Sequence, residues 1–396
     1  MLRTLPSTRG RYGAAATRPD TDVHRLKRQQ GLHGIVLAGA HAWGGCLLDE
    51  VSPRPWLPVA GRPLLGHILD WIRGSGIRSA TVCGNSETVL FHRGLVRAEQ
   101  AGVDLAFSED VMPRGPAGCA RDAGLACRGE TFVAVDGTVL PRVRIADLLA
   151  EHQRTGAAVT LAVTAADSPA GDDAPGLQPA GIYVFSRAAL ELVPAAGYQD
   201  LKESLIPKLC RRGERVSRFV VPPHATQRAA DADSYLAMNF RATEELCRHE
   251  STTEGYHRVA DALVADSAKV PATARLLGPC LVAAGAAVEP GAMIIGPATV
   301  GTDSVVERGA VVSRSAVWDR CRVGAGARVD GTILADGAQV AAEMVLRRVV
   351  RVAPRRSGQG AIGRFVARWV PGRRRNGHRR MAGQFQTSGN FAAGKA

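Results

Sequence analysis

Small residues near the start of the chain follow an apolar run in a pattern that suits phosphate binding. The run from Gly34 to Leu37 is short, apolar and partly β-branched, which predicts a buried strand of a parallel sheet. Ala38 and Gly39 come directly after it, and Gly44 and Gly45 follow in the same loop. Backbone amides can approach a phosphate closely when the side chains around them are this small. The stretch therefore predicts a phosphate-binding turn after the first strand.

The wider stretch from residue 34 to residue 65 resembles the N-terminal signature of the sugar-1-phosphate nucleotidyltransferases, the NDP-sugar pyrophosphorylases. The family pattern is roughly L-A-A-G-x-G-T-R-L, then a spacer, then P-K-P-L-L-P-V-A-G-R-P-L-L. The distance from Leu37 to Pro53 fits this pattern without a gap, and Leu57 to Leu65 matches its second part. The resemblance implies a nucleotide site whose contacts include Leu37, Ala38, Gly39 and Arg54.

Some positions of this stretch carry another residue type than the family pattern. Gly44 stands in place of the arginine that contacts the triphosphate, and Ala40 and Ala42 stand in place of loop glycines. Arg54 stands in place of the lysine, so it is the catalytic candidate that the resemblance leaves. This loop is expected to hold a diphosphate through Arg54, with fewer donors for the transfer step.

Nucleotidyl transfer requires a divalent cation on the α-phosphate, donors around the triphosphate and a pocket that orients the sugar phosphate. The resemblance implies Mg²⁺, held by an aspartate in a strand-end N-G-D and by a second ligand late in the domain. Here the strand ends in Asp136-Gly137-Thr138, which places a neutral hydroxyl, a poor Mg²⁺ ligand, at the metal position. Asp136 is the alternative metal ligand and a candidate nucleotide contact.

The second metal ligand is expected in a late motif of the type W-x-D-I-G-T-P-E-D-Y. The segment from Gln227 to Tyr235 occupies this motif, and we place Gln227 at the ligand position. Asp231 and Asp233 fit the first turn of the following helix, where carboxylates interact favourably with the helix dipole. Both family carboxylates are thus predicted to be missing. An active enzyme would still need Mg²⁺, whereas a non-catalytic protein would need no cofactor.

Two further segments resemble family motifs for the base and the sugar. Residues 114 to 118 stand where the family has L-G-T-A-G, which implies nucleotide contacts at Gly115, Ala117 and Gly118. Pro116 replaces the threonine and removes a hydroxyl and an amide donor. Residues 179 to 185 resemble N-A-G-I-Y-V-F, which implies a sugar contact at Gly181.

Short apolar runs alternate with helical patterns from residue 31 to residue 250. The runs lie at 34–37, 79–83, 132–135, 159–163, 181–185 and 218–221, and the helical patterns lie at about 64–75, 117–126, 144–154, 187–193, 200–212 and 233–249. This alternation is typical of a doubly wound, mostly parallel α/β sheet. Residues 31–250 are therefore predicted to form a Rossmann-like nucleotidyltransferase domain.

A six-residue repeat follows. Apolar residues stand at Leu276, Val282, Val288, Ile294, Val300, Val306 and Val312, and a small residue stands four places after each, from Cys280 to Ala316. The frame then slips by one residue to Val317, Val323 and Val329, and again to Leu334 and Val340. Stacked coils bury such apolar positions in one continuous core, so residues 263–345 are predicted to form a hexapeptide parallel β-helix. The resemblance to hexapeptide-repeat proteins implies the left-handed form.

Positive charge gathers at the two ends of the chain. The net charge is +13, yet no Asp or Glu follows Glu343, while twelve Arg and one Lys do. Residues 1–30 add about +5, which leaves residues 31–343 near −5. A specific nucleic-acid groove in the body is therefore not supported. We predict a disordered basic extension at 1–30, a linker at 251–262 and a basic tail at 346–396.

The tail contains one amphipathic helical pattern. Ile362, Phe365, Val366, Trp369 and Val370 share one face, with Arg364 and Arg368 opposite. Two interpretations stay open: a helix on the anionic inner face of a membrane, or a helix that docks on this chain or on a partner subunit. The chain has no secretory segment and no spanning apolar run, so we predict a cytoplasmic protein. Its eight cysteines form no C-x-x-C pair and are predicted to be buried thiols.

Three functions can be weighed from these residues. An active NDP-sugar pyrophosphorylase would need an atypical metal site. We favour a family member with impaired or absent catalysis in NDP-sugar or polysaccharide biosynthesis, because the substitutions fall at catalytic positions while framework motifs remain. Such a protein would sense a nucleotide or nucleotide sugar, or regulate an active paralogue, and a homo-oligomer is also expected. A hexapeptide acyltransferase needs a histidine base near the coils, and none lies between His257 and His378.

Overall fold

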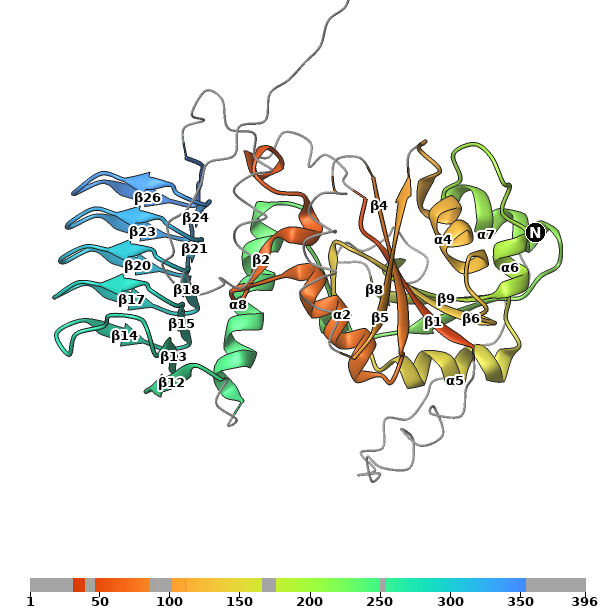
Figure 1. The fold of residues 1–396 in the computed structure, drawn as a ribbon, viewed down its shortest axis with the longest axis horizontal. Coiled ribbons are helices and arrows are strands. Elements are labelled where there is room, and N and C mark those ends of the chain that lie inside the picture. Colours follow the sequence, from red (N-terminus) through yellow and green to blue (C-terminus); the bar gives the residue numbers. More distant parts are fainter. Residues whose placement is uncertain are drawn as a thin grey trace, which may run out of the picture.

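The computed structural model describes residues 31–39, 47–85, 88, 102–110, 112–165, 176–249 and 254–353. They form an α/β domain and a stack of β-coils, with helix α8 (Ala232–Arg248) between the two (Figure 1). The predicted extension at 1–30 and the tail helix with Arg364, Phe365, Arg368 and Trp369 lie outside the described residues. None of the described helices is long and apolar enough to cross a membrane. The described cysteines are free thiols, and all but Cys210 are buried or half-buried.

The α/β domain is built on a seven-stranded sheet in the order β10-β8-β9-β6-β1-β4-β5. The strands are β1 (Leu32–Leu37), β4 (Ser79–Asn85), β5 (Asp104–Asp110), β6 (Thr131–Asp136), β8 (Val159–Ala165), β9 (Leu177–Ser186) and β10 (Val216–Val220). Neighbours are parallel except at β9, which runs antiparallel to both β6 and β8. The predicted mostly parallel sheet is therefore confirmed. The direction of β9 and the edge strand β5 were not predicted.

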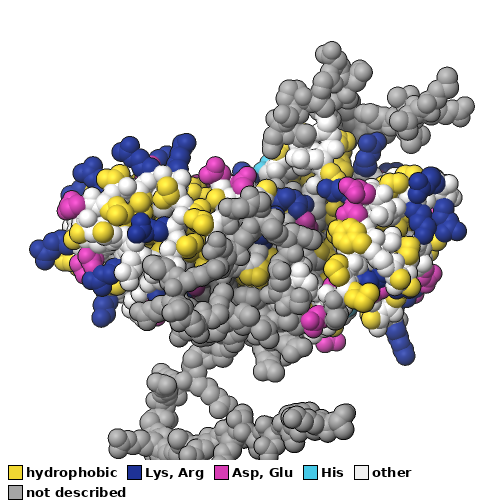
Figure 2. All heavy atoms as spheres, turned by 90° about the horizontal axis from the view of Figure 1, so that it is seen from above, with side chains coloured by type: hydrophobic (Ala, Val, Ile, Leu, Met, Phe, Trp, Pro, Cys, Tyr) yellow, Lys and Arg dark blue, Asp and Glu magenta, His cyan; other side chains and the backbone are white. Residues whose placement is uncertain are grey.

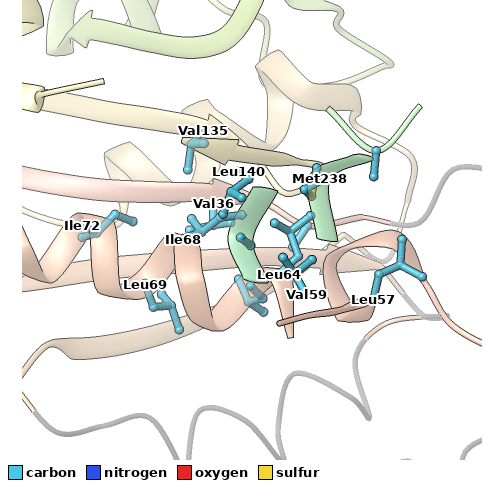
Figure 3. Close-up of a cluster of buried hydrophobic side chains, with 14 of the residues drawn as sticks. Val36, Leu57, Val59, Leu64, Ile68, Leu69, Ile72, Val135, Leu140 and Met238 are labelled. Atoms are coloured by element: carbon cyan, nitrogen blue, oxygen red, sulfur yellow. The ribbon is translucent and has the colours of Figure 1, made fainter. Parts of the chain in front are cut away.

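Helices cover both faces of this sheet because successive strand residues point to opposite sides. The helices are α2 (Leu64–Gly74), α4 (Gly115–Leu125), α5 (Ile145–Thr155), α6 (Arg187–Glu191) and α7 (Ile206–Arg211). Val36 of β1 packs in the core on the α2 side, where Ile68 and Ile72 of that helix lie close to the sheet (Figure 3). Ile35 and Phe132 belong to the separate core under α4 and α6. The domain is thus doubly wound.

Short elements complete the domain. They are η1 (Leu47–Glu50), η2 (Arg54–Trp56), β2 (Pro58–Val59), β3 (Arg62–Pro63), β7 (Val139–Pro141), the π turn η3 (Leu201–Leu205), η4 (Pro223–Ala225) and β11 (Thr226–Arg228). β2 and β3 form a hairpin, and β7 and β11 pair antiparallel into a two-stranded ribbon beside the main sheet. This ribbon carries residues 226 to 228 to the end of β6.

The β-coils form three sheets that stack the predicted repeat. One contains β12 (Tyr256–Val259), β13 (Ala262–Ala265), β15 (Cys280–Val282), β18 (Ala298–Val300), β21 (Ala316–Val317), β24 (Ile333–Leu334) and β27 (Val350–Arg351). The second contains β14 (Arg275–Leu277), β17 (Met293–Ile295), β20 (Val311–Ser313), β23 (Arg328–Asp330) and β26 (Val345–Arg347), and the third β16 (Ala287–Val288), β19 (Val305–Val306), β22 (Arg322–Val323) and β25 (Gln339–Val340). All pairs are parallel except β12 with β13, as expected for a parallel β-helix. β12 lies within the segment predicted as a linker, and β26 and β27 continue the coils past residue 345.

The predicted frame slips fall at one corner of the β-helix. Val282 pairs with Val300, eighteen residues on, whereas Val300 pairs with Val317, only seventeen residues on. All three side chains are buried in one core. The shorter coil also places Ala316 opposite Thr299, not opposite Ala298 as the six-residue spacing predicted. Because later coils shorten at the same corner, the core positions stay stacked.

Helix α8 joins the two bodies through a buried interface. The hydroxyl of Tyr235 donates to the carbonyl oxygen of Pro58 (2.6 Å) and accepts from the indole nitrogen of Trp318 (2.9 Å). Asn239, one helical turn further on, accepts from the amide of Ala60 (2.7 Å) and donates to Thr299 (3.3 Å). The helix therefore packs on the α/β domain and on the β-helix at the same time.

Basic side chains lie over the β-helix, at the left of Figure 2, and also at the opposite end of the molecule. Some of them pair with carboxylates one coil away. Arg314 lies 3.0 Å from Asp330, and Arg320 lies 3.3 Å from Asp336. These arginines therefore form ion pairs that connect neighbouring coils.

Candidate functional site

The residues predicted to bind a nucleotide gather at the carboxyl ends of the central strands. Leu37, the last residue of β1, pairs with Asp136, the last residue of β6. The amide of Gly137 donates to the carbonyl oxygen of Leu37 (2.9 Å), and the amide of Ala38 donates to that of Cys83 (2.7 Å). β1 lies between β4 and β6, where the strand order reverses. In open α/β sheets this edge is where ligands bind.

Gly137 marks a close approach between two loops at this edge. A Cβ atom on Gly137 would stand 3.0 Å from the Cα atom of Ala38 and from the carbonyl oxygen of Leu37, and 3.1 Å from the ring of Pro55. No larger residue fits without a shift of the backbone. The turn after β6 therefore lies directly against the loop after β1 and against η2.

The other two contacts predicted in the first loop, Gly39 and Arg54, flank this edge. A Cβ atom on Gly39 would stand 3.9 Å from the side chain of Asn85, which ends β4. Arg54 begins η2. Hydrogen bonds from Ser234 lower the pKa of the Asp231 carboxyl, and the charge of Arg54 adds to this effect. Arg54 therefore lies near enough to Asp231, which caps the start of α8, for its charge to act there.

Asp136, Thr138 and Arg228 form the polar centre of the edge. Nη1 of Arg228 forms an ion pair with Oδ2 of Asp136 and donates to the hydroxyl oxygen of Thr138 (2.9 Å). Thr138 donates to Oδ1 of Asp136 from its hydroxyl (2.8 Å) and from its amide (2.9 Å). Burial by itself raises the pKa of Asp136, but Arg228 and Thr138 outweigh it, and the pKa is lowered. Both oxygens of this charged carboxylate are thus bonded by the chain's own donors.

Arg228 reaches this centre from the β7–β11 ribbon. It pairs with Val139 across the ribbon, and the next amide, of Ala229, donates to the carbonyl oxygen of Thr138 (2.9 Å). Gly181 of β9, the predicted sugar contact, has a φ of +82°. A Cβ atom there would stand 2.6 Å from Nη2 of Arg228 and 3.4 Å from Cβ of Asp136. The structure thus brings Gly181 and Asp136 together, with Arg228 against the glycine.

The side chains at this centre do not form a suitable set of ligands for Mg²⁺. Magnesium requires near-octahedral oxygen ligands, usually with one or two carboxylates. Here the centre offers one carboxylate, which is bonded to a guanidinium whose charge repels a second cation. Across the described residues no three His, Cys, Asp or Glu side chains gather in a way that could hold a metal ion.

Gln227 was predicted at the second metal position, whereas the side chain that reaches Asp136 and Thr138 is that of Arg228. Adjacent strand residues point to opposite sides, and Oε1 of Gln227 is buried with no hydrogen-bond partner in the described part of the chain. The spacing of the late motif indicates Arg228 at this position. Counted back from Tyr235, the aspartate of W-x-D-I-G-T-P-E-D-Y falls on Arg228. A cation therefore stands where the family pattern has a carboxylate.

The segment predicted to contact the base begins helix α4 and is bonded by a neighbouring loop. The amide of Ala117 donates to the carbonyl oxygen of Gln199 (3.0 Å). Gly115 has a φ of +72°, and a Cβ atom there would stand 2.6 Å from that same oxygen and 3.0 Å from the ring of Tyr198. Gly118 is buried in the first turns of the helix. The amide of Ala117 therefore already donates to the protein's own backbone, and no motif in the sequence predicted this contact.

A separate cavity of about 390 Å³ lies between the α/β domain and the β-helix. Its walls include Arg62, His67, Arg142, Glu245 and Tyr256. Arg142 forms an ion pair with Glu245 across it. None of the residues predicted to bind a nucleotide or a sugar lines this cavity, so it is distinct from the carboxyl edge.

His67 makes the stability of this region depend on pH. Burial lowers its pKa to about 4, with Nε2 bonded to the carbonyl oxygen of Val59 (2.8 Å). Below the ordinary pKa of about 6.5 the unfolded chain binds a proton that the folded chain does not, so stability is expected to fall as pH drops from about 6.5 to 4. The full loss from this residue is up to roughly 3 kcal/mol. From pH 7 to pH 4.5, the free energy of urea unfolding should fall less for His67→Gln than for the unmodified protein. An equal fall in both proteins would contradict this role of His67.

No protein-family model matches the chain. The chain is similar to mannose-1-phosphate guanylyltransferase of Mycobacterium tuberculosis, with 26% identity over 337 residues that cover 79% of this chain and 82% of the relative. A probable mannose-1-phosphate guanylyltransferase of Oryza sativa is 24% identical over 279 residues, 63% of this chain and 75% of the relative. The catalytic subunit beta of the Drosophila melanogaster mannose-1-phosphate guanylyltransferase is 27% identical over 142 residues, 35% of this chain and 38% of the relative.

The first of these similarities is too long to be confined to the α/β domain. It agrees with the order of the seven-stranded sheet and with the β-helix that follows it. The family resemblance of the N-terminal stretch is supported by the same relatives. These similarities therefore support a relation of the chain to the sugar-1-phosphate nucleotidyltransferase family.

Proposed function

We propose that this protein binds a nucleotide sugar at the carboxyl edge of its sheet and transfers nucleotidyl groups very slowly or not at all. It would then act in NDP-sugar metabolism as a sensor or as a regulatory subunit of an active paralogue. The observation that carries the proposal is the contact of Arg228 with Asp136 and Thr138, at the place where the family pattern has metal-binding carboxylates. The names of the relatives make GDP-mannose, the product of guanylyl transfer to mannose-1-phosphate, the first ligand to test.

The chemical reason is the charge that the transfer step must stabilise. Negative charge on the α-phosphate shifts between oxygens as the sugar phosphate attacks, and a divalent ion bound there lowers the barrier. Arg228 brings a single charge, and Asp136 already compensates it. Every 1.4 kcal/mol of lost stabilisation slows the step about tenfold. Slow or absent turnover is therefore expected even when the substrates bind.

Other features of the edge support retained binding. Gly137 and Gly181 both stand where a larger residue would collide with its neighbours; Gly137 follows β6 at the switch point of the sheet, and Gly181 lies on β9 opposite the end of β6. The Drosophila relatives are named as catalytic subunits, which describes proteins that work within assemblies. A family member without catalysis would fit such an assembly as the partner that binds the nucleotide sugar.

The test measures turnover and binding side by side. Pyrophosphate release is followed with a panel of nucleoside triphosphates and sugar-1-phosphates in Mg²⁺, and calorimetry is run with GDP-mannose and other NDP-sugars. We expect binding heat without pyrophosphate release. Turnover in the usual enzymatic range of about 1–10³ s⁻¹ would contradict the proposal and favour an active enzyme with an atypical metal site. Absence of both binding and turnover would contradict the ligand-binding role.

A further inference from the structure

The guanidinium of Arg228 has donors that the protein does not use. Nη1 makes the contacts with Asp136 and Thr138. Nε and Nη2 donate no hydrogen bond to any residue that the structure describes, and 37% of the side chain is exposed. Arginine is always charged and carries five N–H donors in a planar fork. One part of this fork is thus fixed by the protein, while the other donors have no partner among the described residues.

The fixed part holds the fork in one orientation. Asp136 and Thr138 bond Nη1 from the end of β6, and Nη2 lies close to the backbone of Gly181. Gly181 must stay a glycine for this position, because its Cβ atom would stand 2.6 Å from Nη2. The side chain therefore loses little further freedom when it binds a ligand, which favours binding.

The remaining donors of Arg228 belong to the edge of the sheet where a phosphate would arrive. Asp136 pairs with Leu37, and the small residues Ala38 and Gly39 follow at the switch point of the sheet. Arginine and phosphate form paired, charge-assisted hydrogen bonds through two N–H groups at once. Mg²⁺ would have to displace the same guanidinium to reach Asp136. The cation at this edge is therefore part of the chain itself.

We propose that Arg228 binds the diphosphate of a nucleoside diphosphate or NDP-sugar directly, in place of a bridging metal ion, so that binding does not require Mg²⁺. The inference rests on the proposed function, since it assigns the cation of that same site. Asp136 and Thr138 orient the guanidinium, and the Nε and Nη2 hydrogens point to the phosphate oxygens as their acceptors. The chemical class of the ligand is a diphosphate ester of a nucleoside.

Calorimetry with GDP and with GDP-mannose, in EDTA and in Mg²⁺, tests the inference on the full chain. Affinity is expected to agree within about twofold between the two buffers. Arg228→Gln is expected to weaken binding about tenfold or more, because the charge and the fork are lost. Arg228→Lys keeps the charge without the planar fork, so its affinity should lie between those of the unmodified protein and of Arg228→Gln. Arg144→Gln is the matched control: Arg144 is an exposed arginine paired with Asp147 on the surface, and its loss should leave binding unchanged.

A variant of the partner separates a ligand contact from a structural role. Asp136→Asn keeps an oxygen that can accept from Arg228 but removes the charge that holds the guanidinium, so it should weaken diphosphate binding less than Arg228→Gln does, and both variants lower thermal stability. If Asp136→Asn weakened binding as much as Arg228→Gln, Arg228 would be a structural residue only and the inference would be wrong. Binding that needs Mg²⁺ would overturn the inference and leave the proposed function standing. Binding in neither buffer would overturn both.

Discussion

Replacing Trp318 with alanine is expected to lower the free energy of unfolding by about 3–5 kcal/mol, the usual cost of truncating a large buried aromatic side chain. Trp318 is 2% exposed and belongs to the β-helix, yet it packs against Tyr235 of α8, with ring centroids 6.1 Å apart at 88°. Its loss opens the interface between the two bodies. Urea unfolding followed by far-ultraviolet circular dichroism measures the effect, and we expect the single transition to separate into two steps.

Tyr235→Phe is the matched control for this interface. It keeps the aromatic ring and removes the hydroxyl that donates to Pro58 and accepts from Trp318. Two buried polar groups then lose their partner, which costs about 1–3 kcal/mol. If Trp318→Ala cost no more than Tyr235→Phe, the packing of the indole would not hold the two bodies together.

Val312→Asp is expected to destabilise the protein by more than about 4 kcal/mol, because it buries a carboxylate without a partner. Val312 is fully buried and pairs with Ile294 and Val329 in the neighbouring coils. A protonated acid would also lack a hydrogen-bond partner, because the core of the β-helix is apolar around Val312. Soluble yield and the urea midpoint measure the loss.

Val311→Asp tests the direction of the side chains in the same strand. Val311 is half-buried on the outer side and stands between Met293 and Arg328 of the adjacent coils. An aspartate there lies beside a positive charge and should change stability by less than about 1 kcal/mol. Equal losses at the two positions would contradict the inward and outward alternation of β20.

The β-helix could be predicted from the sequence almost residue by residue. Each coil places one valine, isoleucine or leucine in the same core, so the pattern repeats at a fixed spacing and every coil supports the next. Even the slips to Val317 and Leu334 were visible, because the core position moves by one residue in the sequence while staying stacked in space. Local sequence and tertiary structure carry the same information in such a fold.

The α/β sheet was less predictable. Buried strands such as β1 and β6 are continuous apolar runs, which local sequence shows. β5 lies at the sheet edge and alternates buried Leu105 with exposed Asp104 and Ala106, so its pattern is weak. The antiparallel direction of β9 follows from how the chain crosses the sheet, and no residue within the strand encodes it.

The candidate site shows the limit of motif spacing most clearly. Asp136 and Gly181, which separate motifs named as candidate site residues, lie together at one edge of the sheet. Gln227 was predicted at the second metal position, and the contact of its neighbour Arg228 with Asp136, ninety-two residues away, was not predicted. An ion pair between distant residues depends on the β7–β11 ribbon, which is too short to be recognised from sequence. Contacts of this kind decide whether a site holds a metal or a guanidinium.

The shortened corner of the β-helix limits which coils can be exchanged. Between the paired positions 295 and 299 an early coil has three residues, Gly296 to Ala298, whereas between the equivalent positions 313 and 316 a later coil has two, Arg314 and Ser315. A coil moved from the early group into the late group would carry one residue too many at that corner. Within each group, by contrast, coils could be duplicated or deleted as whole units. The β-helix is therefore two modular sets joined at one seam, and its length can vary only by additions that respect the seam.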